Sequence, residues 1–246
     1  MIRKILKTLL LRVLIWVEKT PPQRAALVKR MSIWQREIHI PVYFIVVINL
    51  ILILLSLIVE IGPSAIKLSG LIVFLGLVFY IFTKYIRNYV PEVITDNNAA
   101  MLLGIIACTS VLLIQIPKSI NVISPYVIPL AGMVLLTSIL LGRNAGVVMA
   151  IVLPLILGVI YDFSFEYFFY HSSGSFIAAY LSENINSRQD ITTSGAKIAL
   201  INIFSILIFS TLEYPYIRMM RLAVSEILWA ASNGILASII VLGLLP

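Results

Sequence analysis

The sequence has few of the residues from which most catalytic and metal centres are built. Its 246 residues include one cysteine, Cys108, and two histidines, His39 and His171. One cysteine excludes an internal disulfide and a multi-cysteine metal site, and two histidines are too few for a multi-histidine metal centre. No Walker loop, GxSxG or HExxH motif occurs. The sequence therefore predicts no catalytic residues, no cofactor and no metal, and it predicts that Cys108 is an inert buried thiol.

Charge is also scarce, at 12% of residues against 61% hydrophobic residues. A soluble domain has roughly 25% charged and about 45–50% apolar residues. Even a large soluble domain buries only about 75% of the surface that its unfolded chain exposes, so this chain needs a bilayer as its solvent. The apolar runs are long and continuous, without the alternation of a membrane barrel. The predicted fold class is an all-α, polytopic transmembrane helical bundle.

The lengths of the apolar runs predict about eight spans, since about 20 apolar residues cross the hydrocarbon layer as a helix. The fifth and sixth are short and joined at Asp162–Phe163, so a re-entrant hairpin is an alternative there. The predicted organisation is a basic amphipathic segment (1–39), a first transmembrane helix (40–62) and a seven-helix membrane module (66–246). The predicted spans are 40–61, 66–86, 99–116, 123–141, 145–161, 165–181, 195–212 and 222–245.

Half of the 18 basic residues precede the first predicted span: Arg3, Lys4, Lys7, Arg12, Lys19, Arg24, Lys29, Arg30 and Arg36. Beside anionic lipid, each such charge contributes about 1 kcal/mol of attraction, so this segment is predicted to bind the membrane surface. The positive-inside rule then places the N-terminus in the cytoplasm, and eight spans place the C-terminus there too. Arg218 and Arg221 lie in a predicted exterior loop, where the positive-inside rule does not expect basic residues. No nucleic-acid partner is predicted.

Polar side chains within apolar spans are candidates for function. Asp162 and Glu166 are four residues apart, so on a helix they would share one face as a proton or cation site; the alternative is that both are exterior turn residues. A single His171 is predicted to hydrogen-bond to a neighbouring helix. The candidate intramembrane polar site comprises Asp162, Glu166, His171, Asn202, Glu226 and Asn233.

Two of these residues, Asn202 and Asn233, are amides of the kind that join membrane helices, at about 0.6 kcal/mol on average. Glu226 opens the last span beside Ser225. Small residues allow helix backbones to approach each other closely. The glycines predicted to mark such contacts are Gly104, Gly132, Gly158, Gly174 and Gly234.

Three segments carry a family resemblance: ISPYVIPLAGMVLLTSILLGRNAGVVMAI (123–151), SRQDITTSGAKIALINIFSI (187–206) and NGILASIIVLGLLP (233–246). In this order they resemble the membrane module of bacterial seven-transmembrane receptors with an intracellular HD-type phosphohydrolase domain. The resemblance implies a bacterial inner-membrane location, an exterior sensory domain and a C-terminal HD phosphodiesterase, which degrades cyclic di-AMP in characterised members. Here the first loop is only GPSAIK and the sequence ends at Pro246, so neither domain is in the chain and a further segment is expected to follow.

These observations predict a membrane anchor and signal-transducing module of an HD-type cyclic-dinucleotide phosphodiesterase system, without catalysis in this chain. Its predicted partners are the lipid bilayer, an HD phosphodiesterase domain and further copies of itself. One alternative is a small-solute or ion permease with Asp162, Glu166 and His171 near its pathway. The other is an envelope or cell-shape scaffold, because short polytopic proteins of that kind share the glycine–aspartate pattern of GVIYD, which ends at Asp162.

Overall fold

The computed structural model describes residues 65–91, 93, 96–120, 123–213 and 216–244, so the basic segment and the first predicted span lie outside the described residues. Within the described part, seven long helices follow one another and no strand occurs, which confirms the all-α prediction. Each helix corresponds to one predicted span of the seven-helix module. The helices are α4 (Ala65–Tyr89), α6 (Asn97–Ser119), α7 (Leu130–Leu141), α8 (Arg143–Ile160), α9 (Phe165–Leu181), α10 (Arg188–Glu213) and α11 (Tyr216–Leu244).

The described helices have the length and composition of membrane spans. Four contain stretches long and apolar enough to cross a bilayer, namely all of α6, all of α8, residues 188–211 of α10 and residues 224–244 of α11. At about 1.5 Å per residue, the 17 residues of α9 extend about 25 Å. Helix α7 has only 12 residues, but it is apolar around its whole circumference. The chain is a multi-pass membrane protein.

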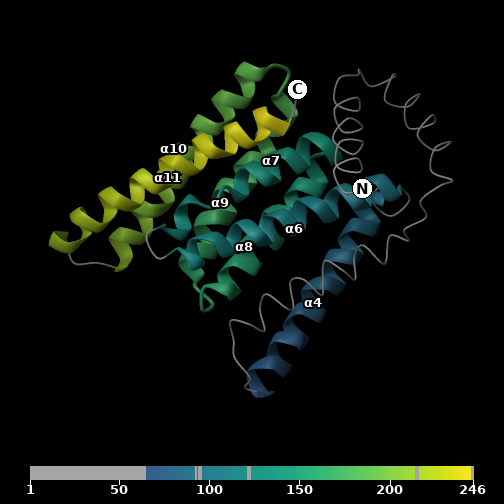
Figure 1. Cartoon of the computed structure of the whole chain (residues 1–246), viewed down its shortest axis with the longest axis horizontal. Helices are drawn as coiled ribbons and strands as arrows, with labels where there is room; N and C mark the ends of the chain where they lie inside the picture. Colours follow the sequence, from purple (N-terminus) through teal and green to yellow (C-terminus); the bar gives the residue numbers. More distant parts are fainter. Residues whose placement is uncertain (1–64, 92, 94–95, 121–122, 214–215, 245–246) are drawn as a thin grey trace.

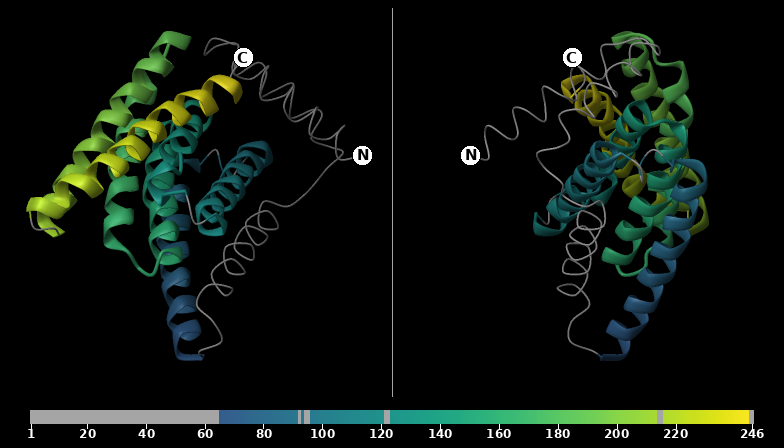
Figure 2. Two further views of the ribbon diagram at one scale, coloured as in Figure 1. Left: turned by 60° about the vertical axis from the view of Figure 1, so that its left-hand side comes forward. Right: turned by 90° about the vertical axis from the view of Figure 1, so that its right-hand side faces the viewer.

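Helix α7 lies at the centre of the bundle, where α6, α8, α9 and α11 pack around it. Ten of its residues are buried, as expected for a helix that is hydrophobic on every side. Helices α10 and α11 lie side by side along one flank of the bundle, and α4 extends away from its opposite flank (Figures 1 and 2). The core therefore lies between α7 and its neighbours, and α4 contributes least to it.

The chain before α7 is not α-helical over 123–129, so the α-helix begins later than the start predicted for this span, residue 123. Pro125 and Pro129 cannot donate backbone hydrogen bonds, and each disfavours helical backbone in the residue before it. Ser124 and Ile128, which precede them, have ψ values of 141° and 117°. Between the two prolines the chain forms only a single 3-10 turn, η2 (Pro125–Val127). Helix α7 begins after the second proline.

A tight turn joins α8 to α9 and separates the two acidic residues near it. Asp162 and Phe163 have φ values of +56° and +59°, in the left-handed region that ends a helix. The Ser164 side chain then accepts a hydrogen bond from the Tyr167 backbone N–H and caps α9. Asp162 thus lies in the turn and Glu166 in the first turn of α9. The hypothesis that both carboxylates share one helical face is wrong.

Glycine permits the closest helix contacts, as predicted for Gly132, Gly158, Gly174 and Gly234. At Gly234 a Cβ atom would lie 2.4 Å from the Gly195 carbonyl oxygen and 2.5 Å from the Ala199 Cβ, both on α10. At Gly132 it would lie 2.7 Å from the Ala237 Cα of α11. Helix α11 is therefore held against both α10 and α7 by backbone-to-backbone packing. Gly104 is buried on α6.

Candidate intramembrane polar site

The break before α7 places irregular backbone inside an apolar bundle. Tyr126, Ile128 and Pro129 are buried there, away from the regular hydrogen bonds of a helix. At membrane depth such backbone is tolerated only where protein groups or water satisfy it, because lipid offers no hydrogen-bond partners. The residues that hydrogen-bond to this segment therefore define the candidate site.

His171 on α9 provides one of these partners. Its Nε2 lies 3.1 Å from the Pro125 carbonyl oxygen, and the side chain is only 2% exposed. Since a carbonyl can only accept, the tautomer that fits this contact carries its proton on Nε2 and donates it. This confirms that His171 makes a hydrogen bond to a neighbouring element, although that element is the η2 turn and not a helix.

Asn233 on α11 provides the most extensive contact. Its Nδ2 donates to the carbonyl oxygens of Tyr126 at 3.0 Å and Ile128 at 2.6 Å. Its Oδ1 accepts from Asn202 Nδ2 of α10 at 3.3 Å. A single buried amide thus connects η2, α10 and α11. The predicted helix-joining role is confirmed for Asn202 and Asn233.

Tyr126 lies at the centre of these contacts. Its carbonyl also accepts a hydrogen bond from the Tyr170 hydroxyl at 3.0 Å. Its ring packs edge-to-face on Tyr167 and Tyr170, with centroid separations of 5.1 and 4.9 Å. Its own hydroxyl donates to the Glu166 carboxylate. We call Tyr126, Glu166, Tyr170, His171, Asn202 and Asn233 the Tyr126 cluster.

The remaining two candidate residues lie differently. Glu226 is half-buried on α11 and interacts electrostatically with Tyr126. Asp162 is exposed in the α8–α9 turn. Among the described residues it forms no hydrogen bond with the cluster, whereas Glu166 accepts one from the Tyr126 hydroxyl. The structure therefore gathers five of the six predicted residues around Tyr126 and places Asp162 outside.

Sequence reasoning missed Tyr126 and Tyr170. Tyrosine in an apolar span is also typical of the lipid interface, so residue type alone did not distinguish these two from the other tyrosines of the chain. The available signal was the pair of prolines at 125 and 129, because a proline-broken span requires donors from its neighbours.

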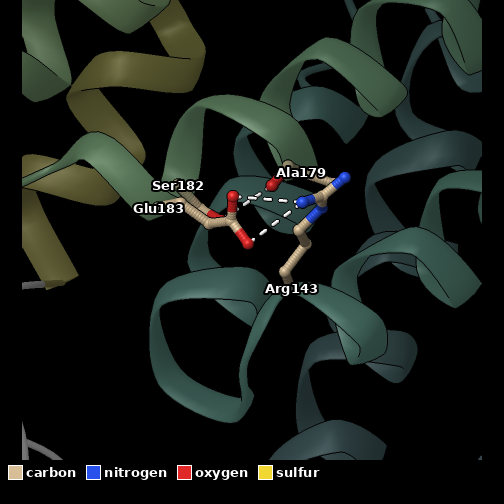
Figure 3. Close-up of polar contacts among 4 residues, drawn as sticks. All are labelled: Arg143, Ala179, Ser182 and Glu183. Atoms are coloured by element: carbon tan, nitrogen blue, oxygen red, sulfur yellow. Dashed lines mark hydrogen bonds and ion pairs between the residues drawn. The ribbon is translucent and has the colours of Figure 1, made fainter. Parts of the chain in front are cut away.

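A second polar group lies at the other end of α8 and α9 and was also missed (Figure 3). Arg143 at the start of α8 donates to both carboxylate oxygens of Glu183, each at 3.1 Å, and its guanidinium lies 5.4 Å from the centre of the Tyr180 ring. Next to it, Asn144 donates to the Tyr89 carbonyl at 3.2 Å and ties α8 to the end of α4. We call this the Arg143 end of the bundle.

The polar groups of the Tyr126 cluster form hydrogen bonds that hold the bundle together. The side-chain donors of Tyr170, His171 and Asn233 are directed at backbone carbonyls, and the Tyr126 hydroxyl is directed at a carboxylate. Among the described residues, no three His, Cys, Asp or Glu side chains come together in a way that would hold a metal ion. Cys108 is half-buried on α6 and forms no disulfide. The cluster holds the broken span against α9 and α11.

A family model described as "7TM receptor with intracellular HD hydrolase" matches residues 65–246. The match begins at the first residue of α4 and includes all seven described helices. Comparison with curated proteins and with solved structures finds no match.

Proposed function

Because the chain belongs to the family of 7TM receptors with an intracellular HD hydrolase, we propose that it transmits a signal through the membrane to an HD-type cyclic-dinucleotide phosphodiesterase. The chain carries the receptor's membrane module, and the hydrolase would be joined to it or act beside it. In this proposal residues 1–39 bind anionic lipid, 40–62 form a first span, and 66–246 form the seven-helix module in a bacterial inner membrane. The family match over all the described helices carries the proposal.

The contacts of α11 support a role in transmission. The Tyr126 cluster links α11 to η2, the segment that follows α6 and precedes α7. Further along α11, Ser238 donates to the Ile191 carbonyl near the start of α10, at the Arg143 end. A displacement of η2 would therefore act directly on the helix that ends at Leu244. In this proposal α11 carries the signal towards the hydrolase.

Deleting the gene in its native host is expected to change the cellular concentration of cyclic di-AMP by severalfold, and restoring the wild-type chain should reverse the change. Nucleotide extraction and mass spectrometry measure both. An unchanged concentration would contradict the proposed signalling role. Solute uptake that is lost in an Asp162→Asn variant would instead support the permease alternative.

The purified chain is expected to hydrolyse no cyclic di-AMP in the presence of Mn²⁺ or Mg²⁺. The reason is that its only histidine among the described residues, His171, is buried and engaged with the Pro125 carbonyl. Chromatography of the nucleotide before and after incubation measures turnover. Hydrolysis that copurifies with the chain and disappears in a His171→Ala variant would overturn this expectation.

Both chain ends are expected on the cytoplasmic side, because half of the basic residues precede the first predicted span and an even number of spans follows. Reporter enzymes that are active on only one side of the membrane, fused at Met1 or Pro246, test this. Signals from opposite sides would refute the eight-span organisation.

A further inference from the structure

A proline interrupts the hydrogen bonds of α8 inside the bundle. Pro154 lies within this helix and is buried. Because proline has no backbone N–H, the carbonyl of Ala150, one turn earlier, does not receive its regular helical hydrogen bond. Ala150 is itself fully buried, at 0% exposed. In a membrane, carbonyls freed by proline are satisfied by neighbouring helices, by serine or threonine side chains or by ordered water.

Two serines of α9 lie at the level of this proline. Helices α8 and α9 run antiparallel from their tight turn, and a Cβ atom at Gly158 would lie 3.3 Å from the Phe168 Cβ. Pro154 is one turn before Gly158 and Ser172 is one turn after Phe168, so antiparallel packing places the proline and the serine at one level. Ser175 follows on the same face of α9, seven residues after Phe168. The freed carbonyl of α8 and the two serines therefore belong to one region of the α8–α9 interface.

The hydroxyls of both serines are buried without a partner. Ser172 is 7% exposed and Ser175 is 0% exposed, and neither Oγ forms a hydrogen bond with a described residue. A buried serine in a helix can instead donate to the carbonyl one turn earlier, as Ser110 does to the Ile106 carbonyl at 2.7 Å. Buried polar groups without partners are unfavourable. Two hydroxyls and one carbonyl in this region therefore call for a small group that both donates and accepts.

We propose that an ordered water molecule binds between α8 and α9, where it donates to the Ala150 carbonyl and accepts from the hydroxyls of Ser172 and Ser175. A buried water typically makes about three hydrogen bonds to groups that have no other partner, and three such groups are available here. An ion fits less well, because α8 has no charged residue after Arg143, its first residue. The site concerns the packing of α8 on α9 and does not depend on the proposed signalling function.

A double-mutant cycle on the detergent-solubilised full chain tests the site. Ser172→Ala/Ser175→Ala is expected to lower the denaturant concentration at the midpoint of unfolding, because the Ala150 carbonyl loses its water. Pro154→Ala restores the backbone N–H that satisfies this carbonyl. In the Pro154→Ala background the same two substitutions should therefore no longer lower the midpoint. Ser110→Ala is the matched control, and its effect should be equal in both backgrounds.

Two results of this cycle would overturn the proposal. A higher or unchanged midpoint in Ser172→Ala/Ser175→Ala would show that the hydroxyls have no partner, since replacing an unpaired polar group with an apolar one is neutral or stabilising. An equal decrease in the wild-type and Pro154→Ala backgrounds would show that the serines act independently of the freed carbonyl.

X-ray radiolysis of the purified chain provides a measurement that does not depend on stability. Radiolysis converts bound water into hydroxyl radicals, which oxidise adjacent side chains even when these are buried. Mass spectrometry should detect oxidation of Pro154, and this oxidation should fall severalfold in Ser172→Ala/Ser175→Ala. Pro129, a buried residue of the same type before α7, is the control and should be oxidised less. Equal oxidation of the two prolines in the wild type would contradict a water at Pro154.

Discussion

Replacing Asn233 with leucine is expected to lower the free energy of unfolding by about 2 kcal/mol. The side chain is 1% exposed, and the substitution removes its bonds to the carbonyls of Tyr126 and Ile128 and to the Asn202 amide. A buried polar group left without a partner costs about 1–3 kcal/mol. The Tyr126 carbonyl keeps its bond from Tyr170 and the Ile128 carbonyl keeps one from the Leu130 backbone, which limits the loss. The Asn202 amide loses its hydrogen bond to the Asn233 side chain.

Unfolding of the detergent-solubilised chain, followed by circular dichroism during a denaturant titration, measures this loss. Ser232→Ala is the matched control on the same helix. Among the described residues, the Ser232 hydroxyl bonds only to the Leu228 carbonyl of its own helix, so its removal should change stability by less than about 0.5 kcal/mol. Equal stability of the Asn233→Leu and Ser232→Ala variants would show that the contacts to η2 do not hold the broken span.

Gly234→Ala is expected to destabilise the chain by about 2 kcal/mol, although alanine is the better helix former. The added Cβ would lie 2.4 Å from the Gly195 carbonyl oxygen and 2.6 Å from the Ala199 backbone nitrogen. Backbone atoms cannot rotate away as a flexible side chain can, so α10 and α11 must separate. Inserting a methyl group into a closely packed core typically costs about 1–3 kcal/mol. The same denaturant titration measures the effect.

Gly243→Ala provides the control of opposite sign, because a Cβ atom at Gly243 on the same helix would meet nothing within 4 Å. There only helix propensity acts. It favours alanine by about 0.8–1.0 kcal/mol in a helix interior, and by less at Gly243, next to the last residue of α11. A stabilising effect at both positions would show that α10 and α11 do not cross as closely as the structure places them.

Several features of the protein follow from the sequence alone. The all-α membrane fold and the approximate positions of the seven helices follow from the length of each apolar run and the scarcity of charge, which are local properties that the bilayer acts on directly. The helix-joining roles of Asn202 and Asn233 also follow, since an amide in an apolar span must find a partner. The same reasoning anticipated the hydrogen bond of His171.

Other features were decided only by the tertiary structure. The partners of Asn233 at Tyr126 and Ile128 are 107 and 105 residues away, and Arg143 meets Glu183 across 40 residues. Such contacts depend on how each helix is rotated and where the helices cross. In a soluble helix a polar face reveals the rotation, but here the lipid-facing and core-facing surfaces are both apolar. For this reason the Tyr126 cluster became visible only once the helices were packed.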